Sequence, residues 1–303
     1  MTFFLARIQR AILQRRRKLT AGASVLMALA LTSCGLAGAD DEDKTISIIV
    51  TESAPFQEPT EIAKELLAEE GWELQPTYVT DIVQPNQVVS QGEYDANFFQ
   101  HLAYLRQFNA DNDTDVEPAF SSYYQQSGIF SLNYDSLDDL PDGAEIALPV
   151  DTANNGRGIK LLAEHGLLEI DESIPVTSLS QSDIVENPHN FEFVEVDQQS
   201  TAHTLSDVDA GFVFSRLVAE AGHDVHETAL ALEEDEDVRH PYTNVVAVQP
   251  GDQDSAKTQA LQEAYQSPEV QEWMEDYLDG VLEYNDEVTT DNAPEVWETF
   301  TAE

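Results

Sequence analysis

Cysteine and basic residues are scarce in this sequence. Its 303 residues include one cysteine, Cys34, and 14 lysines and arginines against 58 aspartates and glutamates, for a net charge of −44. A single cysteine excludes a disulfide within the chain. Because so negative a surface repels phosphate, we expect no nucleic-acid partner. Such acidity is typical of proteins exposed to high salt, where charges are screened over about 3 Å at 1 M salt and repel each other little.

The N-terminal residues have the pattern of an export signal. Basic residues from Arg7 to Lys18 precede the apolar run LTAGASVLMALAL, which is shorter than the roughly 20 apolar residues that span a bilayer. The run ends in LTSC, which resembles the bacterial lipobox. We therefore predict a signal peptide over residues 1–33, then a lipidated Cys34 and an acidic linker over 34–43. An ordinary secretory peptide with a chance cysteine stays open, as does the export route, including the twin-arginine one.

The charge of the remaining chain is still more one-sided. Six of the 14 basic residues and none of the acidic residues precede Cys34, which leaves eight basic against 58 acidic side chains and a net charge of −50. Any buried arginine in this part therefore stands out from its background.

Strands and helices alternate through the rest of the chain. Short β-branched and apolar runs predict strands over residues 44–51, 73–80, 94–99, 144–150, 191–196, 209–215 and 243–250. Helical spacing of apolar residues predicts helices over residues 59–71, 83–92, 157–166, 216–222, 258–267 and 268–278. This alternation predicts an α/β fold with largely parallel sheets. The last residues, 285–303, read as a poorly ordered acidic tail in which Trp297 alone docks.

The pattern starts twice, which predicts two α/β lobes with a ligand cleft between them. We expect lobe I over residues 44–133 plus 243–303 and lobe II over residues 134–242. The chain is expected to cross between the lobes near Ser131–Asp135 and near Pro241–Thr243.

Motifs for catalysis and metal binding are missing. The sequence has no G-x-S-x-G nucleophile motif, and NNGRG lacks the lysine of a phosphate-binding loop. The one close histidine pair, His223 and His226, follows Gly222 in a predicted solvated loop. We therefore expect no enzyme, no metal and no other cofactor. A lipid-anchored hydrolase and a metal-uptake receptor remain as alternatives.

One arginine is a candidate for binding an anion. In PVDTANNGRGIKLLAEHG a predicted strand, a Gly/Asn-rich loop and a helix follow one another, with Arg157 at the start of the helix. Free N–H groups there favour an anion, and an arginine can bind a carboxylate through two hydrogen bonds. Pairing of Arg157 with one of the many acidic side chains is the alternative, and the pattern alone does not decide between them.

Five blocks occur in a specific order: VTDIVQPNQVVSQGEYDANFFQHLAYLRQFN, SLDDLPDGAEIALPVDTANNGR, SDIVENPHNFEFVEVD, LSDVDAGFVFSRLVAEAG and PYTNVVAV. With the lipobox, they resemble the methionine-binding lipoprotein family (NlpA/MetQ type) of ABC-transporter substrate-binding proteins, over residues 44–280. The resemblance implies a type II periplasmic-binding-protein fold whose lobes close on a free amino acid, typically methionine. It also implies a monomer, anchored outside the cytoplasm by a lipid, which delivers its ligand to a permease and an ATPase.

The same resemblance implies which residues contact the ligand. They fall in the NFFQHLAY, NNGR and PYTN segments: Phe98, Phe99, His101, Tyr104, Asn154, Arg157 and Asn244. The aromatic positions would form a slot for a thioether, and Asn154 and Arg157 would hold the polar end of the amino acid.

Two positions depart from the family pattern. Ile82 stands where the family has a tyrosine, and Phe214 falls where it has an asparagine. An unpaired buried polar group on a ligand costs about 1–3 kcal/mol, so losing two polar partners changes what fits. The alternative is therefore the same fold with another apolar amino acid or a short methionine-containing peptide as ligand.

Overall fold

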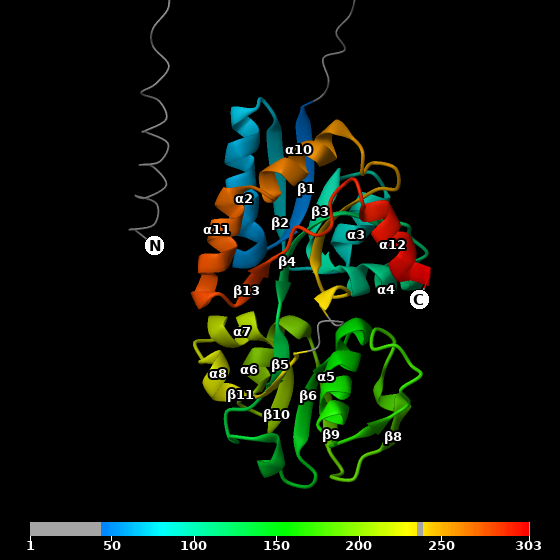
Figure 1. The fold of residues 1–303 in the computed structure, drawn as a ribbon, viewed down its shortest axis with the longest axis vertical. Helices are drawn as coiled ribbons and strands as arrows, with labels where there is room; N and C mark the ends of the chain where they lie inside the picture. The colour runs from blue at the N-terminus through cyan, green and yellow to red at the C-terminus, as the bar shows by residue number, and fades with distance from the viewer. Residues whose placement is uncertain (1–43, 235–238, 303) are drawn as a thin grey trace, which may run out of the picture. The chain divides into compact units, whose positions relative to one another are not determined.

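The structure is a computed structural model that describes residues 44–234 and 239–302. The predicted signal peptide, the linker and the lipid site at Cys34 lie outside the described residues. From Lys44 on, the chain forms a single unit built around two sheets (Figure 1). In this part no helix combines the length and the apolar character needed to cross a bilayer.

The first sheet has six strands in the order β13-β4-β12-β3-β1-β2. Its strands are β1 (Thr45–Thr51), β2 (Glu73–Val79), β3 (Ala96–His101), β4 (Glu117–Gln125), β12 (Asn244–Val248) and β13 (Leu282–Tyr284). β1 pairs in parallel with β2 and β3, whereas β12 runs antiparallel between β3 and β4.

The second sheet has five strands in the order β11-β5-β10-β6-β9. Its strands are β5 (Ser127–Phe130), β6 (Glu145–Pro149), β9 (Glu192–Val196), β10 (Ala210–Phe214) and β11 (Ala229–Leu232). β6 pairs in parallel with β9 and β10, and β5 runs antiparallel between β10 and β11. A separate two-stranded pair joins β7 (Glu169–Ile170) and β8 (Ile184–Glu186).

Helices cover both sheets (Figure 1). Those of the first lobe are α2 (Ala54–Glu69), α3 (Gln84–Ser90), α4 (Leu102–Asn112), α10 (Ala256–Tyr265), α11 (Pro268–Asp276) and α12 (Ala293–Ala302). Those of the second are α5 (Thr152–Glu164), α6 (Thr201–Thr204), α7 (Ser215–Glu220) and α8 (Val225–Thr228). Short 3₁₀ turns occur at Leu137–Asp139, Gln181–Asp183, Gln198–Ser200 and Tyr277–Asp279.

The two sheets are built by the same rule. In each sheet, three strands lie side by side in the spatial order second, first, third, where the numbers count their order along the chain. An antiparallel strand, which follows a crossing of the chain from the other lobe, lies beside the third. β12 has this place in the first sheet and β5 has it in the second. The α/β, two-lobe fold expected from the sequence is confirmed, with its strand ends meeting between the lobes.

The first crossing between the lobes lies at Gln126, not near Ser131–Asp135. β4 ends at Gln125 in the first sheet and β5 begins at Ser127 in the second, so Gln126 alone links them. Ser127 and Gly128 directly after Gln126 are turn-type residues, but Asn133 and Asp135 after Ser131 form the longer stretch of loop-like composition. The expected crossing followed that stretch, which marks the end of β5 rather than the change of sheet. The return crossing lies between β11 and β12.

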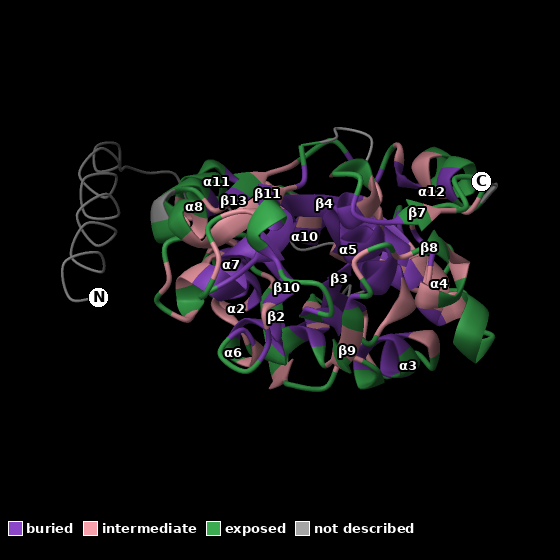
Figure 2. Cartoon of the chain, turned by 90° about the horizontal axis from the view of Figure 1, so that it is seen from below, coloured by how far each residue is buried: buried purple, intermediate pink, exposed green. Residues whose placement is uncertain are grey.

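The core of the first lobe has two layers, one on each face of its sheet. Ile46, Ile48 and Val50 of β1 point toward α2, α10 and α11, while Ile49 points toward α3 and α4. This alternation is the two-residue period of a strand that is buried on both faces. Figure 2 shows the result, with buried strands inside and exposed residues on the outer sides of the helices.

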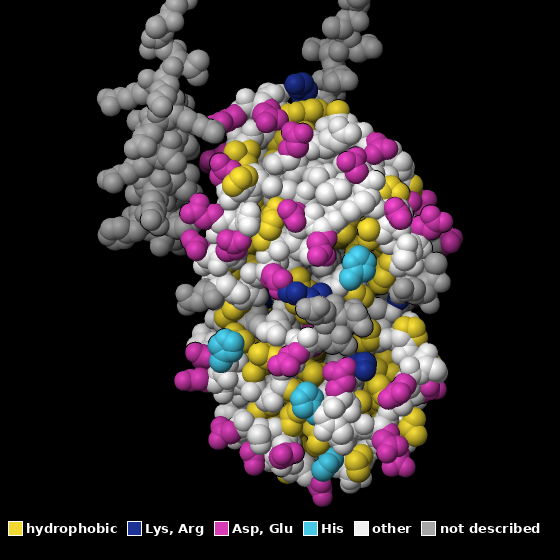
Figure 3. Space-filling view, in the orientation of Figure 1, with side chains coloured by type: hydrophobic (Ala, Val, Ile, Leu, Met, Phe, Trp, Pro, Cys, Tyr) yellow, Lys and Arg dark blue, Asp and Glu magenta, His cyan; other side chains and the backbone are white. Residues whose placement is uncertain are grey.

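The C-terminal residues form helix α12 rather than a poorly ordered tail. Trp297 and Phe300 pack in clusters that include Leu102 and Tyr242. The Arg106 guanidinium lies 4.3 Å from the centroid of the Phe300 ring, and its Nη1 donates to the Phe300 carbonyl over 2.9 Å. The segment was expected to be poorly ordered because of its acidic composition, although its apolar residues recur at helical spacing. Acidic side chains elsewhere spread over the surface of both lobes (Figure 3).

Candidate functional site

A cavity of about 490 Å³, counting space open to solvent, lies where strand ends of both lobes meet. Thr51 ends β1, His101 ends β3 and Gln125 ends β4 in the first sheet, and Phe214 ends β10 in the second. Carboxyl ends of strands are where ligands bind in α/β folds.

Seven of the nine residues expected at the ligand site line this cavity. They are Ile82, Phe99, His101, Tyr104, Asn154, Phe214 and Asn244. Ile82 and Phe214, the two departures from the family pattern, are thus both in the wall. The wall is aromatic on one side, where the rings of Phe99 and Tyr104 meet edge to face with centroids 5.8 Å apart.

Eight lining residues escaped the sequence analysis. Thr51, Phe56, Gln100 and Gln125 come from the first lobe. Asp151, Gln198, Gln199 and Arg216 come from the second. Arg216 could have been found, because it follows the end of β10 and basic residues are rare in this chain.

Phe98 is a core residue and not part of the cavity wall. Its ring lies 4.9 Å from that of Phe56, 6.3 Å from that of Tyr123 and 5.4 Å from that of Tyr265, measured between centroids. Successive residues of a strand face opposite sides. Within NFFQH, Phe98 therefore points into the first-lobe core and its neighbour Phe99 points elsewhere.

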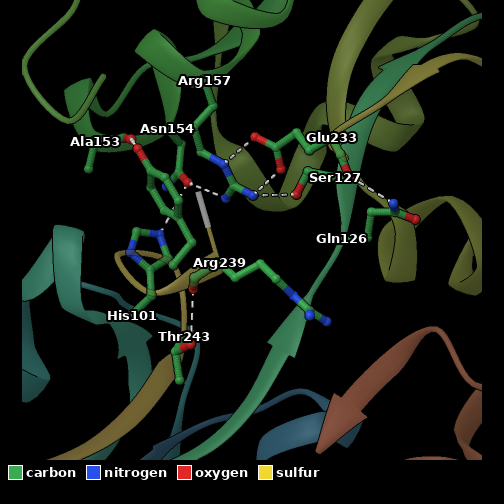
Figure 4. A network of polar contacts seen from close by, with 10 residues as sticks. His101, Gln126, Ser127, Ala153, Asn154, Arg157, Glu233, Arg239 and Thr243 are labelled. Atoms are coloured by element: carbon green, nitrogen blue, oxygen red, sulfur yellow. Dashed lines mark hydrogen bonds and ion pairs between the residues drawn. The ribbon is translucent and has the colours of Figure 1, made fainter. Parts of the chain in front are cut away.

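A polar network joins the two lobes beside the cavity (Figure 4). The Tyr104 backbone N–H donates to Nδ1 of His101 over 3.1 Å, which places the ring proton on Nε2. That Nε2 lies 3.1 Å from Oδ1 of Asn154 and donates to it. The Asn154 amide nitrogen in turn donates to Oδ1 of Asp151 over 2.8 Å. Each polar atom in this chain of hydrogen bonds therefore has a defined role as donor or acceptor.

Burial sets the protonation of this network. Burial first, and then the nearby Arg157 charge, lower the pKa of His101 from 6.5 to about 3, so the ring is neutral at physiological pH. Burial also raises the pKa of the Asp151 carboxyl, against the hydrogen bonds from Asn154 and the Arg157 charge. Both pKa shifts are expected, because burial disfavours the charged form of a side chain.

Arg157 is 1% exposed and is already paired. Its Nε donates to Oε1 of Glu233 over 2.9 Å and its Nη2 to Oε2 over 2.5 Å (Figure 4). Nη2 also reaches the Ser127 hydroxyl at 3.0 Å, and Nη1 donates to Oδ1 of Asn154 over 3.1 Å. Burial alone would lower the pKa of Arg157, but the Glu233 carboxylate outweighs it and the pKa is raised.

Arg157 already has partners within the protein, and the carboxylate clamp expected there stays a prediction. Helix α5 begins at Thr152, so Arg157 is in its second turn, and the Asp151 side chain caps the helix by accepting from the Asn154 backbone N–H. The face of the guanidinium lies 3.9 Å from the centroid of the Tyr242 ring, and Arg157 is not among the residues that line the cavity. Arg157 does contact the lining residue Asn154, through the hydrogen bond from its Nη1.

Arg216 is the second buried arginine and does line the cavity. Its Nη1 lies 3.2 Å from both carboxylate oxygens of Glu220 and 3.4 Å from the Ser53 hydroxyl of the first lobe. Its Nη2 donates to Oε1 of Gln199 over 3.1 Å. Its Nε is buried without a hydrogen-bond partner among the described residues.

The described ranges contain no group of three or more His, Cys, Asp or Glu side chains that could hold a metal ion. His226 lies in the short helix α8 rather than in a loop.

Comparison with known proteins identifies the family. A family model described as NlpA lipoprotein matches residues 46–283. The chain belongs to the NlpA lipoprotein family. The methionine-binding lipoprotein MetQ of Bacillus subtilis is similar, with 31% identity over 268 residues, 88% of this chain and 98% of that protein. The resemblance expected from the sequence is confirmed.

Solved structures agree with this family assignment. A nutrient-binding protein from Burkholderia cenocepacia, solved bound to methionine, shares 30% identity at a TM-score of 0.73 over 79% of this chain and 99% of that one. An ABC-transporter periplasmic substrate-binding protein from Coxiella burnetii shares 26% identity at a TM-score of 0.72 over 79% and 100%. Helix α12 lies beyond the region that the NlpA lipoprotein family model matches.

Proposed function

We propose that this protein is the substrate-binding lipoprotein of an ABC importer and that its ligand is methionine. The observation that carries the proposal is a cavity between two lobes of an NlpA-family chain, with an aromatic wall and a polar wall. The apolar side chains of Phe99, Tyr104 and Phe214 suit a thioether, which contacts aromatic rings favourably. The carboxylate and amide groups suit the charged end of an amino acid.

The cellular setting follows from the N-terminal pattern. We propose that Cys34 carries the lipid, that the chain is a monomer held outside the cytoplasm, and that it delivers its ligand to a permease and an ATPase. The protein would catalyse no reaction. Delivery requires the lobes to open about the two crossings, at Gln126 and between β11 and β12, and ligand binding then shifts the population toward the closed arrangement.

Calorimetry tests the ligand. The purified protein is unfolded and refolded in high salt to remove carried-over ligand, and then titrated with L-methionine and with D-methionine. We expect saturable one-to-one binding. Phe99→Leu should weaken it about tenfold, because part of the aromatic wall is lost. Phe191→Leu is the matched control, since Phe191 is equally buried but lies in the second-lobe core.

Three results would argue against this function. Folded protein that binds neither enantiomer removes methionine as the ligand and favours another apolar amino acid or a short peptide. Hydrolysis of an ester or peptide would favour the hydrolase. Zinc or manganese in the purified protein, with stability lost on chelation, would favour a metal-uptake receptor.

A further inference from the structure

We infer that the C-terminal helix α12, together with Arg106, holds the two lobes in the closed arrangement and so slows release of the ligand. The inference rests on the proposed function, because it concerns how long the closed lobes retain the proposed amino-acid ligand. Helix α12 lies beyond the residues that the family model matches, so membership of the family assigns it no role.

The first step is that α12 is fixed to the first lobe. The chain that leads to it is bonded to strand β4, where the Ser121 backbone N–H donates to the Val288 carbonyl over 2.9 Å. The Val288 backbone N–H in turn donates to the Ser121 hydroxyl over 3.0 Å. Within α12 the rings of Trp297 and Phe300 lie 6.0 Å apart, and Phe300 is buried. The helix lies next to α4 of the same lobe (Figure 1).

The second step is that the apolar cluster around Phe300 extends across both lobes. Its first-lobe members include Leu102 of α4 and Val245 of β12. Ala153 of α5 belongs to the same cluster, and Val176 packs against it, and both are second-lobe residues. Separating the lobes would divide this cluster and expose apolar surface to water, which is unfavourable.

The third step is that one side chain bonds α12 and the second lobe together. Nη1 of Arg106, on α4, donates to the Phe300 carbonyl over 2.9 Å, and its Nη2 donates to the Thr177 hydroxyl. Phe300 is in the last turn of α12, where carbonyls lack partners within the helix and a cation is favourable. Thr177 lies between β7 and β8 in the second lobe and is buried. Opening the lobes would break this charge-assisted hydrogen bond.

The fourth step is that these contacts bear on the part of α5 that lines the cavity. The segment at Val176 packs so closely on α5 that its carbonyl leaves no room for a Cβ at Gly156. The Tyr242 hydroxyl, from the cluster around Phe300, donates to the Ala153 carbonyl over 3.0 Å. Asn154, which lines the cavity, lies between these two points of support. Contacts made through α12 therefore hold this wall of the cavity against the first lobe.

Ligand kinetics test the inference. Phe300→Ala removes the central ring of the cluster and should make methionine dissociate about tenfold faster, with little change in its association rate, because the closed arrangement loses a contact. Stopped-flow fluorescence measures both rates. Phe191→Ala is the matched control: it removes the same side chain at a similarly buried position inside the second-lobe core, and should leave both rates as they were.

A milder variant removes only the contact between the lobes. Thr177→Val keeps the shape of the side chain and the packing of α12 but removes the acceptor for Arg106, and should make dissociation about threefold faster. Thr60→Val is its control, because it removes a buried hydroxyl whose hydrogen bonds lie within the first lobe. If Phe300→Ala does not fold, Thr177→Val tests the inference by itself.

The distance between the lobes gives a second measurement that needs no ligand. Gln87→Cys on α3 and Glu192→Cys on β9 place one spin label on an exposed position of each lobe, after the one native cysteine has been replaced by Cys34→Ser. In the ligand-free protein, Phe300→Ala should increase the population with a long distance between the labels. Phe191→Ala should leave the distance distribution unchanged.

The outcomes separate this inference from the proposed function. Unchanged dissociation rates and label distances in Phe300→Ala and Thr177→Val would show that the α12 contacts persist when the lobes open, and the inference would be wrong. Equally fast dissociation from Phe300→Ala and Phe191→Ala would show only a general loss of stability, which also overturns it. Folded unmodified protein that binds no methionine would overturn the proposed ligand, and the label distances would then decide whether α12 holds the lobes together.

Discussion

The two buried arginines of the second lobe differ in what surrounds them. Arg157 is held by Glu233, Ser127 and Asn154 and stacks on Tyr242. Arg216 lines the cavity, is bonded through Nη1 and Nη2, and has a buried Nε with no hydrogen-bond partner among the described residues. Both are 1% exposed, so burial alone does not distinguish the two arginines. What separates them is whether the donors are already used.

This difference changes what a mutation at each position should do. A buried ion pair is weak evidence for stability, yet removing one partner is costly because the other charge stays buried and unpaired. Replacing Arg157 should therefore affect mainly the stability of the fold. Replacing Arg216 should affect stability less and ligand binding more, since its acidic partner reaches solvent.

The largest expected effect is on the free energy of unfolding when Arg157 is replaced. Arg157→Gln leaves Glu233 unpaired and should lower the free energy of unfolding by about 3–5 kcal/mol. Arg216→Gln should cost about 1 kcal/mol, because Glu220 remains partly solvated. Denaturant unfolding at one fixed high salt concentration measures both. Adding Glu233→Gln to Arg157→Gln should recover most of the loss, and equal costs for the two single variants would contradict the comparison.

The next effect is on pH dependence, through His101 beside Arg157. Its folded pKa of about 3 lies below the unfolded value of 6.5, so below pH 6.5 the unfolded chain binds a proton that the folded chain does not. Stability from this residue is therefore complete above pH 6.5 and is lost as the pH falls toward 3. Between pH 7 and pH 5 the loss should be about 2 kcal/mol.

Unfolding of His101→Gln at the same pH values measures this contribution by difference. The variant should lose about 2 kcal/mol less than the unmodified protein over this interval. His165→Gln is the matched control, because it removes a histidine that is exposed at the end of α5. Parallel curves for His101→Gln and the unmodified protein would show that the ring is not held neutral.

The smallest effect concerns the apolar wall, away from both arginines. Ile82→Ala should weaken methionine binding about fivefold, or about 1 kcal/mol, because part of the contact with the ligand side chain is lost. Val83→Ala, at a neighbour that is 44% exposed, is the control and should not change the affinity. Unchanged affinity in Ile82→Ala would mean that this side chain does not contact the ligand.

The start of α5 shows why the local sequence misled. NNGRG has the composition of a loop, but Gly156 and Gly158 lie inside the helix. A Cβ at Gly156 would lie 2.2 Å from the Val176 carbonyl oxygen, and one at Gly158 would lie 2.6 Å from a methyl group of Leu148. These glycines are there for close packing, not for a turn. A pattern of residue types cannot distinguish the two reasons, because the neighbours are distant in sequence.

The sequence by itself determined the α/β alternation, the two lobes and seven of the fifteen residues that line the cavity. Periodicity is a local property and predicts the strands and helices, whereas Phe99, His101, Asn154 and Asn244 were placed at the site by the resemblance of their sequence segments to a known family. The tertiary structure decided the roles of the arginines. Glu233 is 76 positions from Arg157 in sequence, and Ser53 is 163 positions from Arg216. Which donors remain free depends on such distant partners, and only folding brings them within hydrogen-bonding distance.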